Sequence, residues 1–171
     1  MKIAPIETER LRLRGFEKAD ALFAIGIWND PEMGQYLPDP ALETIDPAYL
    51  HMVEALGEDE ECCYLIAEQK DTRERIGTCS FIPQNGGASY DIAYCVHKSH
   101  WGRGYATEMA RGMIAHAAAQ GAGKITVDVN RENAASNHIV QKLGFAPVGE
   151  RTYTKKGTDR LFTDIRYERN L

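Results

Sequence analysis

The sequence lacks the patterns of a metal site, a disulfide framework and a membrane segment. Its four cysteines show no CxxC spacing and its five histidines no HExxH motif, so we expect buried thiols and no bound metal. No apolar run approaches the length of a membrane span, and the opening MKIAPIETER has no long apolar core of a secretion signal. These absences favour a cytoplasmic protein that does not enter a membrane.

Positive charge is also scarce, because 20 Lys and Arg residues stand against 25 Asp and Glu residues, for a formal net charge of −5. No tract is rich in Lys or Arg, so binding to nucleic acid or to an anionic membrane surface is not expected. The 171 residues, 43% of them hydrophobic, suffice for a core. The chain shows no internal repeat or linker, and we expect one domain over residues 1–171.

Two common nucleotide-binding motifs are missing. No Walker loop, GxxxxGK[ST], occurs, and the only candidate for a dinucleotide fingerprint has Thr107 where a third Gly or Ala is required. What the chain does contain is HWGRGYATEM at residues 100–109.

In this segment Gly102 and Gly104 stand at the start of a helical pattern. Glycine lets a ligand approach the backbone closely, and the first turn of a helix has unpaired N–H groups and a partial positive charge. The segment therefore predicts an anion site suited to phosphate, with Arg103, Thr107 and Arg111 available for added contacts. The alternative is a tight turn that binds nothing.

Hydrophobic periodicity predicts strands that alternate with helices in mid-chain and a hairpin at the end. The expected class is α/β (α+β), a mixed sheet with helices on both faces. The expected strands cover residues 10–16, 62–68, 75–82, 89–96, 124–130, 146–153 and 161–167. The expected helices cover residues 17–28, 47–56, 104–121 and 133–143, with a loop over 29–40.

Two ordered motifs, WGRGYATE at 101–108 and NAASNHIVQKLGF at 133–145, together resemble the GNAT superfamily of acetyl-CoA-dependent N-acetyltransferases. The segments TERLRLRGFEKADA and YDIAY resemble its ribosomal-protein N-terminal acetyltransferase (RimJ/RimL-like) branch. The resemblance covers nearly the whole chain. It implies a mostly antiparallel central sheet with a splayed parallel strand pair, acetyl-CoA as cofactor, and transfer of acetyl to a primary amine.

The resemblance also implies where the cofactor lies. The family's pyrophosphate loop matches Trp101, Gly102, Arg103, Gly104, Tyr105 and Ala106, with Trp101 in place of the usual Gln or Arg. The pantetheine arm would lie between the strand that ends at residues 94–96 and the strand at 124–130. Backbone N–H groups of Tyr94, Cys95 or Val96 would hold the thioester oxygen, and Asn133 would bond the pantetheine arm.

For the leaving sulfur, many family members carry a tyrosine at the position of Val140, and the RimL-like solution is a serine at the position of Ser136. We therefore place Ser136 opposite the sulfur. Asp91 is the expected general base, with Glu150 and His97 as runners-up. The alternatives are that Ser136 and Asn133 only begin a helix, and that Asp91 is a paired surface carboxylate.

The acceptor is the least constrained prediction. An α-amino group has a pKa of about 8, so roughly a tenth is neutral at pH 7, far more than for lysine, and this favours a protein N-terminus. A polyamine, an aminoglycoside or another small amine is the rival acceptor, and a non-catalytic acyl-CoA-binding module is the rival class. We also expect a monomer or a homodimer. The acidic residues near the first loop would attract a cationic acceptor or form a solvated loop; they are Asp30, Glu32, Asp39, Glu43 and Asp46.

Overall fold

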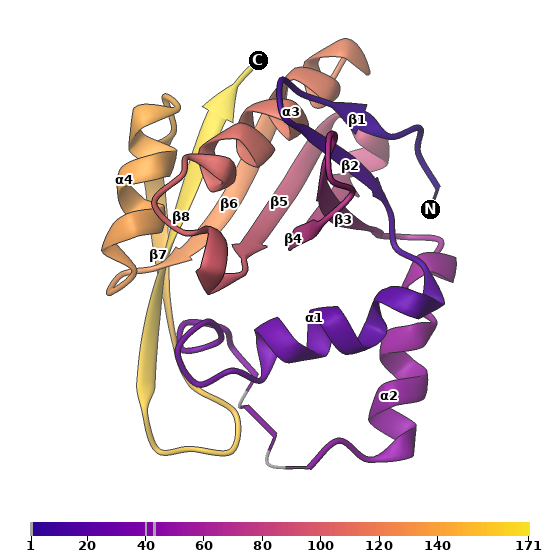
Figure 1. Cartoon of the computed structure of the whole chain (residues 1–171). Helices are drawn as coiled ribbons and strands as arrows, with labels where there is room; N and C mark the ends of the chain where they lie inside the picture. Colours follow the sequence, from indigo (N-terminus) through magenta and orange to yellow (C-terminus); the bar gives the residue numbers. More distant parts are fainter. Residues whose placement is uncertain (1, 40, 43) are drawn as a thin grey trace.

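An eight-stranded sheet, in the order β1-β2-β3-β4-β5-β6-β8-β7, runs through the computed structural model, which describes residues 2–39, 41–42 and 44–171 (Figure 1). The strands are β1 (Ile6–Glu7), β2 (Leu11–Gly15), β3 (Cys63–Gln69), β4 (Arg75–Gln84), β5 (Ser89–Val96), β6 (Lys124–Asn130), β7 (Ala146–Thr154) and β8 (Leu161–Asn170). The helices are α1 (Ala21–Trp28), α2 (Pro47–Glu54), α3 (Tyr105–Ala119) and α4 (Ala134–Lys142), joined by short 3-10 turns.

All neighbouring strands are antiparallel except β5 and β6. These two strands are parallel and pair only from Ser89–Lys124 to Asp91–Thr126. Beyond that point they diverge, and the sheet has a gap between the second half of β5 and the second half of β6. The predicted fold class, a mixed and mostly antiparallel sheet with a splayed parallel pair, is confirmed.

Helix α3 covers the centre of one face of the sheet (Figure 1). Its four-residue periodicity buries Met109, Met113 and Ala117 completely, against β5 and β6 among others. Gly112 of the same helix lets β1 and the turn after it pack closely, because a Cβ there would lie 2.8 Å from Cγ2 of Thr8. The packing fixes the direction of α3, so its first turn lies beside the open end of the gap.

Helices α1 and α2 cover the opposite face over β3 and β4, where Ala24, Ile25 and Val53 pack with Ile66. This face thus has its own small core, separate from the one beneath α3. Near β5, β6 and β8 it carries polar side chains instead, because Thr126 and Asp128 alternate with the buried valines of β6.

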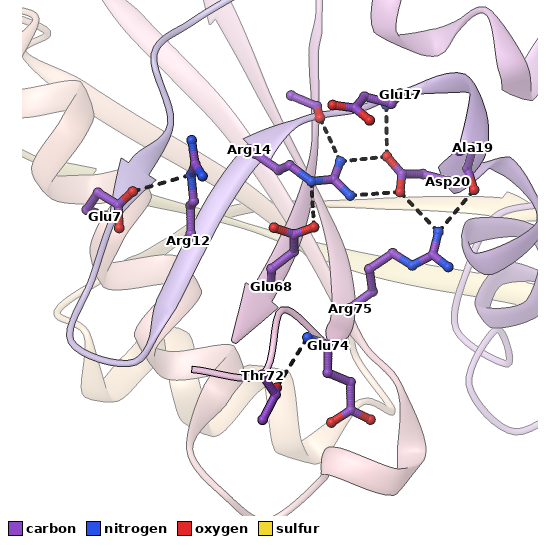
Figure 2. A network of polar contacts seen from close by, with 11 residues as sticks. Glu7, Arg12, Arg14, Glu17, Ala19, Asp20, Glu68, Thr72, Glu74 and Arg75 are labelled. Carbon is purple, nitrogen blue, oxygen red and sulfur yellow. Dashed lines mark hydrogen bonds and ion pairs between the residues drawn. The ribbon is translucent and has the colours of Figure 1, made fainter. Parts of the chain in front are cut away.

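A buried ionic network joins this second layer to the sheet (Figure 2). Arg14 contacts Asp20 at 2.7 Å and Glu68 at 2.6 Å, and Arg75 reaches Asp20 at 3.2 Å. Asp20 is only 1% exposed. Burial by itself would raise the pKa of Asp20, but hydrogen bonds from Arg14, Glu17 N–H and Arg75 outweigh it and lower the pKa. The network fixes the start of α1 against β2, β3 and β4.

The predicted elements are all present, with boundaries that differ by a few residues. β5 and β6 have the predicted ends, whereas β4 and β8 run further, to Gln84 and Asn170. Strand β1 was missed, because two residues are too few for a periodic pattern. Pro40, the last residue of the predicted loop, lies outside the described residues.

Candidate functional site

Two glycines in the left-handed region shape the segment between β5 and α3. Gly102 has a φ of +73° and Gly104 a φ of +80°, values that strain residues with a Cβ. A Cβ on Gly102 would meet nothing within 4 Å, and one on Gly104 only the Arg10 guanidinium at 3.7 Å. The backbone conformation, not crowding, therefore requires glycine, and the space in front of the loop is open.

The first turn of α3 has no side-chain cap. Its first intrahelical bond runs from the N–H of Glu108 to the carbonyl of Gly104 at 3.1 Å, so the N–H groups of residues 105–107 have no partner within the helix. The starts of α2 and α4, by contrast, are capped by the side chains of Asp46 and Asn133. Uncapped amides and the positive end of the helix dipole together favour an anion here.

Arg10 and Glu108 hold this loop from the side, and we call the pair the Arg10–Glu108 clasp. Arg10 donates from Nε to one Glu108 oxygen and from its backbone N–H to the other, both at 2.7 Å. It also donates to the carbonyl of Arg103 at 3.1 Å, and its guanidinium lies 4.4 Å from the ring centroid of Tyr105. Thr8 donates to Glu108 at 2.6 Å. Burial opposes ionisation of Glu108, but these hydrogen bonds outweigh it and lower its pKa.

Sequence reasoning missed the clasp because its two members are 98 residues apart. It did place Arg111 near the site. Beside the clasp lies a groove of about 620 Å³, whose cations are Arg10, Arg111 and Lys142. Its lining consists of Glu7, Thr8, Glu9, Arg10, Gly104, Thr107, Glu108, Arg111, Gly112, Ala115 and Lys142. Three carboxylates, those of Glu7, Glu9 and Glu108, balance the three cations of this lining.

The loop side chains have different surroundings. Trp101 is 46% exposed, and its Nε1 donates to the carbonyl of Val96 at 2.7 Å, which ties the loop to the end of β5. The Arg103 side chain is exposed. The Tyr105 side chain is buried in the core, where its hydroxyl accepts a hydrogen bond from Gln69 at 2.6 Å. Tyr105 therefore offers only its backbone to a ligand.

The backbone N–H and C=O groups of successive β5 residues point alternately toward β4 and toward the side of β6. His97 donates its N–H to the carbonyl of Ile76 at 2.8 Å, and hydrogen-bonded pairs alternate along an antiparallel ladder. In the observed register this alternation directs the backbone groups of Cys95 to β4 and those of Tyr94 and Val96 to the gap. Of the three N–H groups offered as alternatives for the thioester oxygen, those of Tyr94 and Val96 thus face the gap and that of Cys95 faces β4. Burial raises the pKa of the Cys95 thiol to about 11, so it is not a nucleophilic thiolate at neutral pH.

Helix α4 begins beside the open end of the gap. The side chain of Asn133 accepts a hydrogen bond from the N–H of Ser136 at 3.1 Å, so the cap that the sequence offered as an alternative does exist and is Asn133. The Ser136 hydroxyl has no part in this cap. Val140, at the position of the family tyrosine, is 1% exposed and belongs to the core.

The Tyr94 side chain approaches Ser136 from β5. It packs against the core beneath α3, and its Oη is buried without a well-aligned hydrogen bond among the described residues. Burial raises the pKa of Tyr94, and the neighbouring Ser136 hydroxyl partly offsets the rise. The sequence pointed to the Tyr94 backbone and missed the phenol.

Asp91 lies on the other face of the sheet, at the last pair before β5 and β6 diverge. Its Oδ2 accepts hydrogen bonds from Thr126 at 2.5 Å and from Arg166 at 3.2 Å. Burial raises the pKa of Asp91, Thr126 and Arg166 oppose the rise, and Asp128 adds to it. Because both hydrogen bonds go to one oxygen, Oδ1 can still accept a proton. The gap thus separates Ser136 on one side from Asp91 on the other.

The two runners-up for the base have other partners. Glu150 is exposed on β7 and pairs with Arg131. His97 begins a 3-10 turn, and its Nδ1 lies 2.8 Å from Oγ of Ser99. Of the three candidates, Asp91 is the one that lies where β5 and β6 separate.

The acidic residues near the first loop have local partners. Asp30 and Glu32 both contact Nζ of Lys98, at 2.8 and 3.4 Å, and the hydrogen bond from Lys98 lowers the pKa of Asp30 to about 2. Asp39 pairs with Lys156 of the β7–β8 turn at 3.5 Å. Asp46 caps the start of α2. Glu43 lies outside the described residues. These contacts leave less charge to attract a cationic acceptor than the sequence indicated.

The described residues (2–39, 41–42, 44–171) lack the features of two other site types. No helix among them is both long enough and apolar enough to cross a bilayer. They also contain no group of three or more His, Cys, Asp and Glu side chains arranged to hold a metal ion.

The chain is similar to known acetyltransferases in sequence and in fold. A family model described as an acetyltransferase (GNAT) domain matches residues 10–146. The chain is 30% identical over 159 residues to the uncharacterized N-acetyltransferase p20 of Bacillus licheniformis, covering 90% of this chain and 89% of that protein. It is 29% identical over 150 residues to the uncharacterized N-acetyltransferase YoaA of Bacillus subtilis, covering 84% of each.

Solved structures share the fold at lower identity. The spermidine N-acetyltransferase of Vibrio cholerae, solved with CoA and spermine, superposes with a TM-score of 0.80 at 19% identity over 94% of this chain and 95% of that one. RimL, a ribosomal L7/L12 α-N-protein acetyltransferase, superposes with a TM-score of 0.81 at 18% identity over 98% of this chain and 94% of that one.

Proposed function

The chain belongs to the GNAT acetyltransferase family and is an acetyl-CoA-dependent N-acetyltransferase, and from this premise we propose that its acceptor is the α-amine of a protein N-terminus. The cofactor site rests on the uncapped first turn of α3 and on the divergence of β5 and β6; the choice of acceptor rests on one observation, that the candidate base Asp91 is a carboxylate already hydrogen-bonded to Thr126 and Arg166. The gap has a hydroxyl donor on one side and a carboxylate on the other.

The cofactor contacts that we propose use mostly backbone. The N–H groups of residues 105–107, with Gly102, Arg103 and Gly104 in front of them, hold the diphosphate of coenzyme A. The N–H groups of Tyr94 and Val96, which face the gap, bond the pantetheine arm and the thioester oxygen. The Nδ2 of Asn133 serves the pantetheine arm, because its Oδ1 already caps α4.

Bound acetyl-CoA supplies an activated acetyl group on a thiol of pKa about 8.5. In our proposal Ser136 donates a hydrogen bond to the sulfur as the carbon–sulfur bond breaks. The positive end of α4 adds to this effect, because Ser136 lies in the first turn of the helix. On the opposite face Asp91 accepts the proton that the amine releases as it forms the new carbon–nitrogen bond.

The strength of this base favours an α-amine. An α-ammonium has a pKa of about 8, so roughly a tenth is already neutral at pH 7, whereas an alkyl ammonium such as that of lysine titrates near 10.4. Asp91 accepts hydrogen bonds from Thr126 and Arg166 and is a weak base for deprotonating an alkyl ammonium. The RimJ/RimL-like branch is accordingly the part of the family that we propose for this chain.

A polyamine is the second candidate acceptor. It is supported by the similarity to a spermidine N-acetyltransferase at a TM-score of 0.80. The loop carboxylates argue against it, because Asp30 and Glu32 already pair with Lys98.

Thiol release from acetyl-CoA, followed with a thiol-reactive dye, tests the proposal. The acceptor panel contains peptides with a free N-terminus, the same peptides with a blocked N-terminus and an internal lysine, spermidine, and an aminoglycoside. We expect rapid release only with free N-termini. Release with spermidine and not with peptides would replace the proposal with the second candidate. Equal release with blocked and free peptides would contradict it.

A further inference from the structure

Arg166 of β8 binds two carboxylates of neighbouring strands at once. Its Nη1 donates to Oδ2 of Asp128 at 3.0 Å, and its Nη2 donates to Oδ2 of Asp91 at 3.2 Å. Nη2 also donates to the hydroxyl oxygen of Thr126 at 3.1 Å, and that hydroxyl donates to Asp91 at 2.5 Å. One guanidinium thus supplies countercharge to the candidate base and to a second carboxylate beside it.

The register of three strands brings these groups together. Asp91 is the partner of Thr126 at the last parallel pair of β5 and β6, and Arg166 stands opposite Asp128 on the antiparallel pair of β6 and β8. Thr126 and Asp128 are two residues apart and share the face of β6 that turns away from α3. Arg166 therefore meets Asp128 directly and Asp91 diagonally. The cluster lies where the gap begins, on the side where the proposed function puts the amine.

A ligand can reach this cluster from solvent. Arg166 and Asp128 are exposed, and Asp91 is partly exposed. Ion pairs with this exposure contribute little to stability. The main effect of Arg166 is therefore on the charge at the edge of the gap and not on folding.

Resting on the function proposed above, we propose that Arg166 is a specificity-determining residue that excludes polycationic amines from the acceptor site. A polyamine that places one nitrogen at the thioester carries further ammonium groups, which need anionic partners. Asp91 and Asp128 have the required charge, but Arg166 already binds both, and its own charge repels another cation. A peptide has no second ammonium at this distance from its α-amine, so Arg166 affects it little.

A second ion pair joins the same faces of β6 and β8 without touching the candidate base. Nζ of Lys124 lies 3.0 Å from Oε1 of Glu168, at the end where β5 and β6 still pair. Loss of the cation from either pair changes the net charge equally. Only loss of Arg166 frees carboxylates at the gap, so the two pairs form a matched comparison.

Arg166→Gln tests the proposal through acceptor selectivity. The acceptors are a peptide with a free N-terminus, spermidine, and butylamine, which has an alkyl ammonium like spermidine but no additional charge. We expect the ratio of kcat/KM for spermidine to kcat/KM for the peptide to rise about fivefold or more, as for exposed ion pairs that form anew, and the butylamine ratio to stay within about twofold. The rise for spermidine should shrink at high salt, because the attraction is electrostatic.

Two further variants serve as controls. Lys124→Gln should leave both ratios within about twofold, because the carboxylate that it frees lies away from the gap. Arg166→Lys keeps the positive charge and should leave the spermidine ratio near that of the unchanged protein. A rise in the spermidine ratio for Lys124→Gln equal to that for Arg166→Gln would assign the effect to net charge and overturn the proposal.

Two other results would also overturn it. One is a spermidine ratio that Arg166→Gln leaves unchanged, including an equal loss of activity with all acceptors. The other is an equal rise for butylamine, which would assign the effect to the strength of the base. Calorimetric titration with spermidine in the presence of coenzyme A gives the same comparison for a variant that does not turn over.

The unchanged protein reports separately on the proposed function. Its preferred acceptor is read from its own kcat/KM values, before any substitution. The role of Arg166 is read from the change in a ratio on substitution, whichever acceptor the unchanged protein prefers. Failure of the proposed function is therefore distinguishable from failure of this inference.

Discussion

Replacing Gly104 by alanine tests whether the start of α3 is the phosphate site. Its φ of +80° costs a residue with a Cβ about 1–2 kcal/mol. The added Cβ would touch only the Arg10 guanidinium at 3.7 Å, an ordinary contact, so steric clash adds little. Gly121, just beyond the other end of α3, has a φ of +81° and nothing within 4 Å of its Cβ position. Gly121→Ala therefore carries the same backbone cost at the far end of the same helix.

The two variants should be alike in stability and different in function. At about 2–4 °C per kcal/mol for a chain of this length, each should lower the melting temperature by roughly 2–8 °C. Relief of the strain at residue 104 rotates the adjoining amides, including the N–H of Tyr105. A charge-assisted hydrogen bond contributes about 1.5–3 kcal/mol, so the KM for acetyl-CoA should rise about tenfold to a hundredfold in Gly104→Ala. In Gly121→Ala it should stay within twofold.

The measurements are thermal denaturation, calorimetric titration with coenzyme A, and steady-state kinetics at a saturating amine. Equal KM values in the two variants, with both melting temperatures lowered, would refute the assignment of the α3 terminus to phosphate. A rise in KM for both would also refute it, because it would show that loss of stability alone weakens binding.

Three further predictions concern the clasp, the ionic network and the base. Arg10→Ala should raise the KM for acetyl-CoA about three- to tenfold, roughly 1 kcal/mol, with kcat unchanged; adding Glu108→Gln should have little further effect if the pair acts as a unit. Asp20→Asn should lower the free energy of unfolding by about 3–5 kcal/mol, because it leaves Arg14 buried with less countercharge, and KM should not change. The pKa of Asp20 is lowered in the folded state. The stability that its ionised form contributes is therefore present above the ordinary Asp pKa near 3.9 and is lost as pH falls below that value. Urea titrations should accordingly show that the free energy of unfolding falls less in acid for Asp20→Asn than for the unchanged protein. Since the pKa of Asp91 is raised, kcat/KM should fall below a midpoint above 3.9, and Asp91→Asn should remove that limb; an unchanged limb would exclude Asp91 as the base.

Local patterns in the sequence predicted the strands that border the gap. β5 and β6 are runs rich in apolar, aromatic and β-branched residues and are bounded by glycine or polar turns, so their ends could be placed correctly. The two-residue period of a strand places the Tyr94 side chain on the same face as Tyr90 and Ile92. It cannot show that Ser136 lies opposite, since that depends on how α4 packs.

Contacts between distant segments explain the other differences. Arg10 with Glu108, and Asp30 with Lys98, are separated by 98 and 68 residues, and no periodicity links them. The sequence therefore presented Asp30 as free acidic charge and offered no role for Arg10. The alternation of the β4–β5 ladder likewise needs a register, which decided that Tyr94 and not Cys95 faces the gap.

The start of α3 departs from two local stability rules. Its first turn has no side-chain cap although α2 and α4 have one, and Gly104 holds a left-handed conformation there. Buried polar atoms without a hydrogen bond occur elsewhere among the described residues too, for example Oε2 of Glu68 in the ionic network, so a missing partner alone does not mark a ligand site. At the start of α3 the free amides, the helix dipole and the open space before the two glycines coincide. In our assignment these amides face the diphosphate of coenzyme A, so groups that lower stability in the free protein would contribute binding energy to the cofactor.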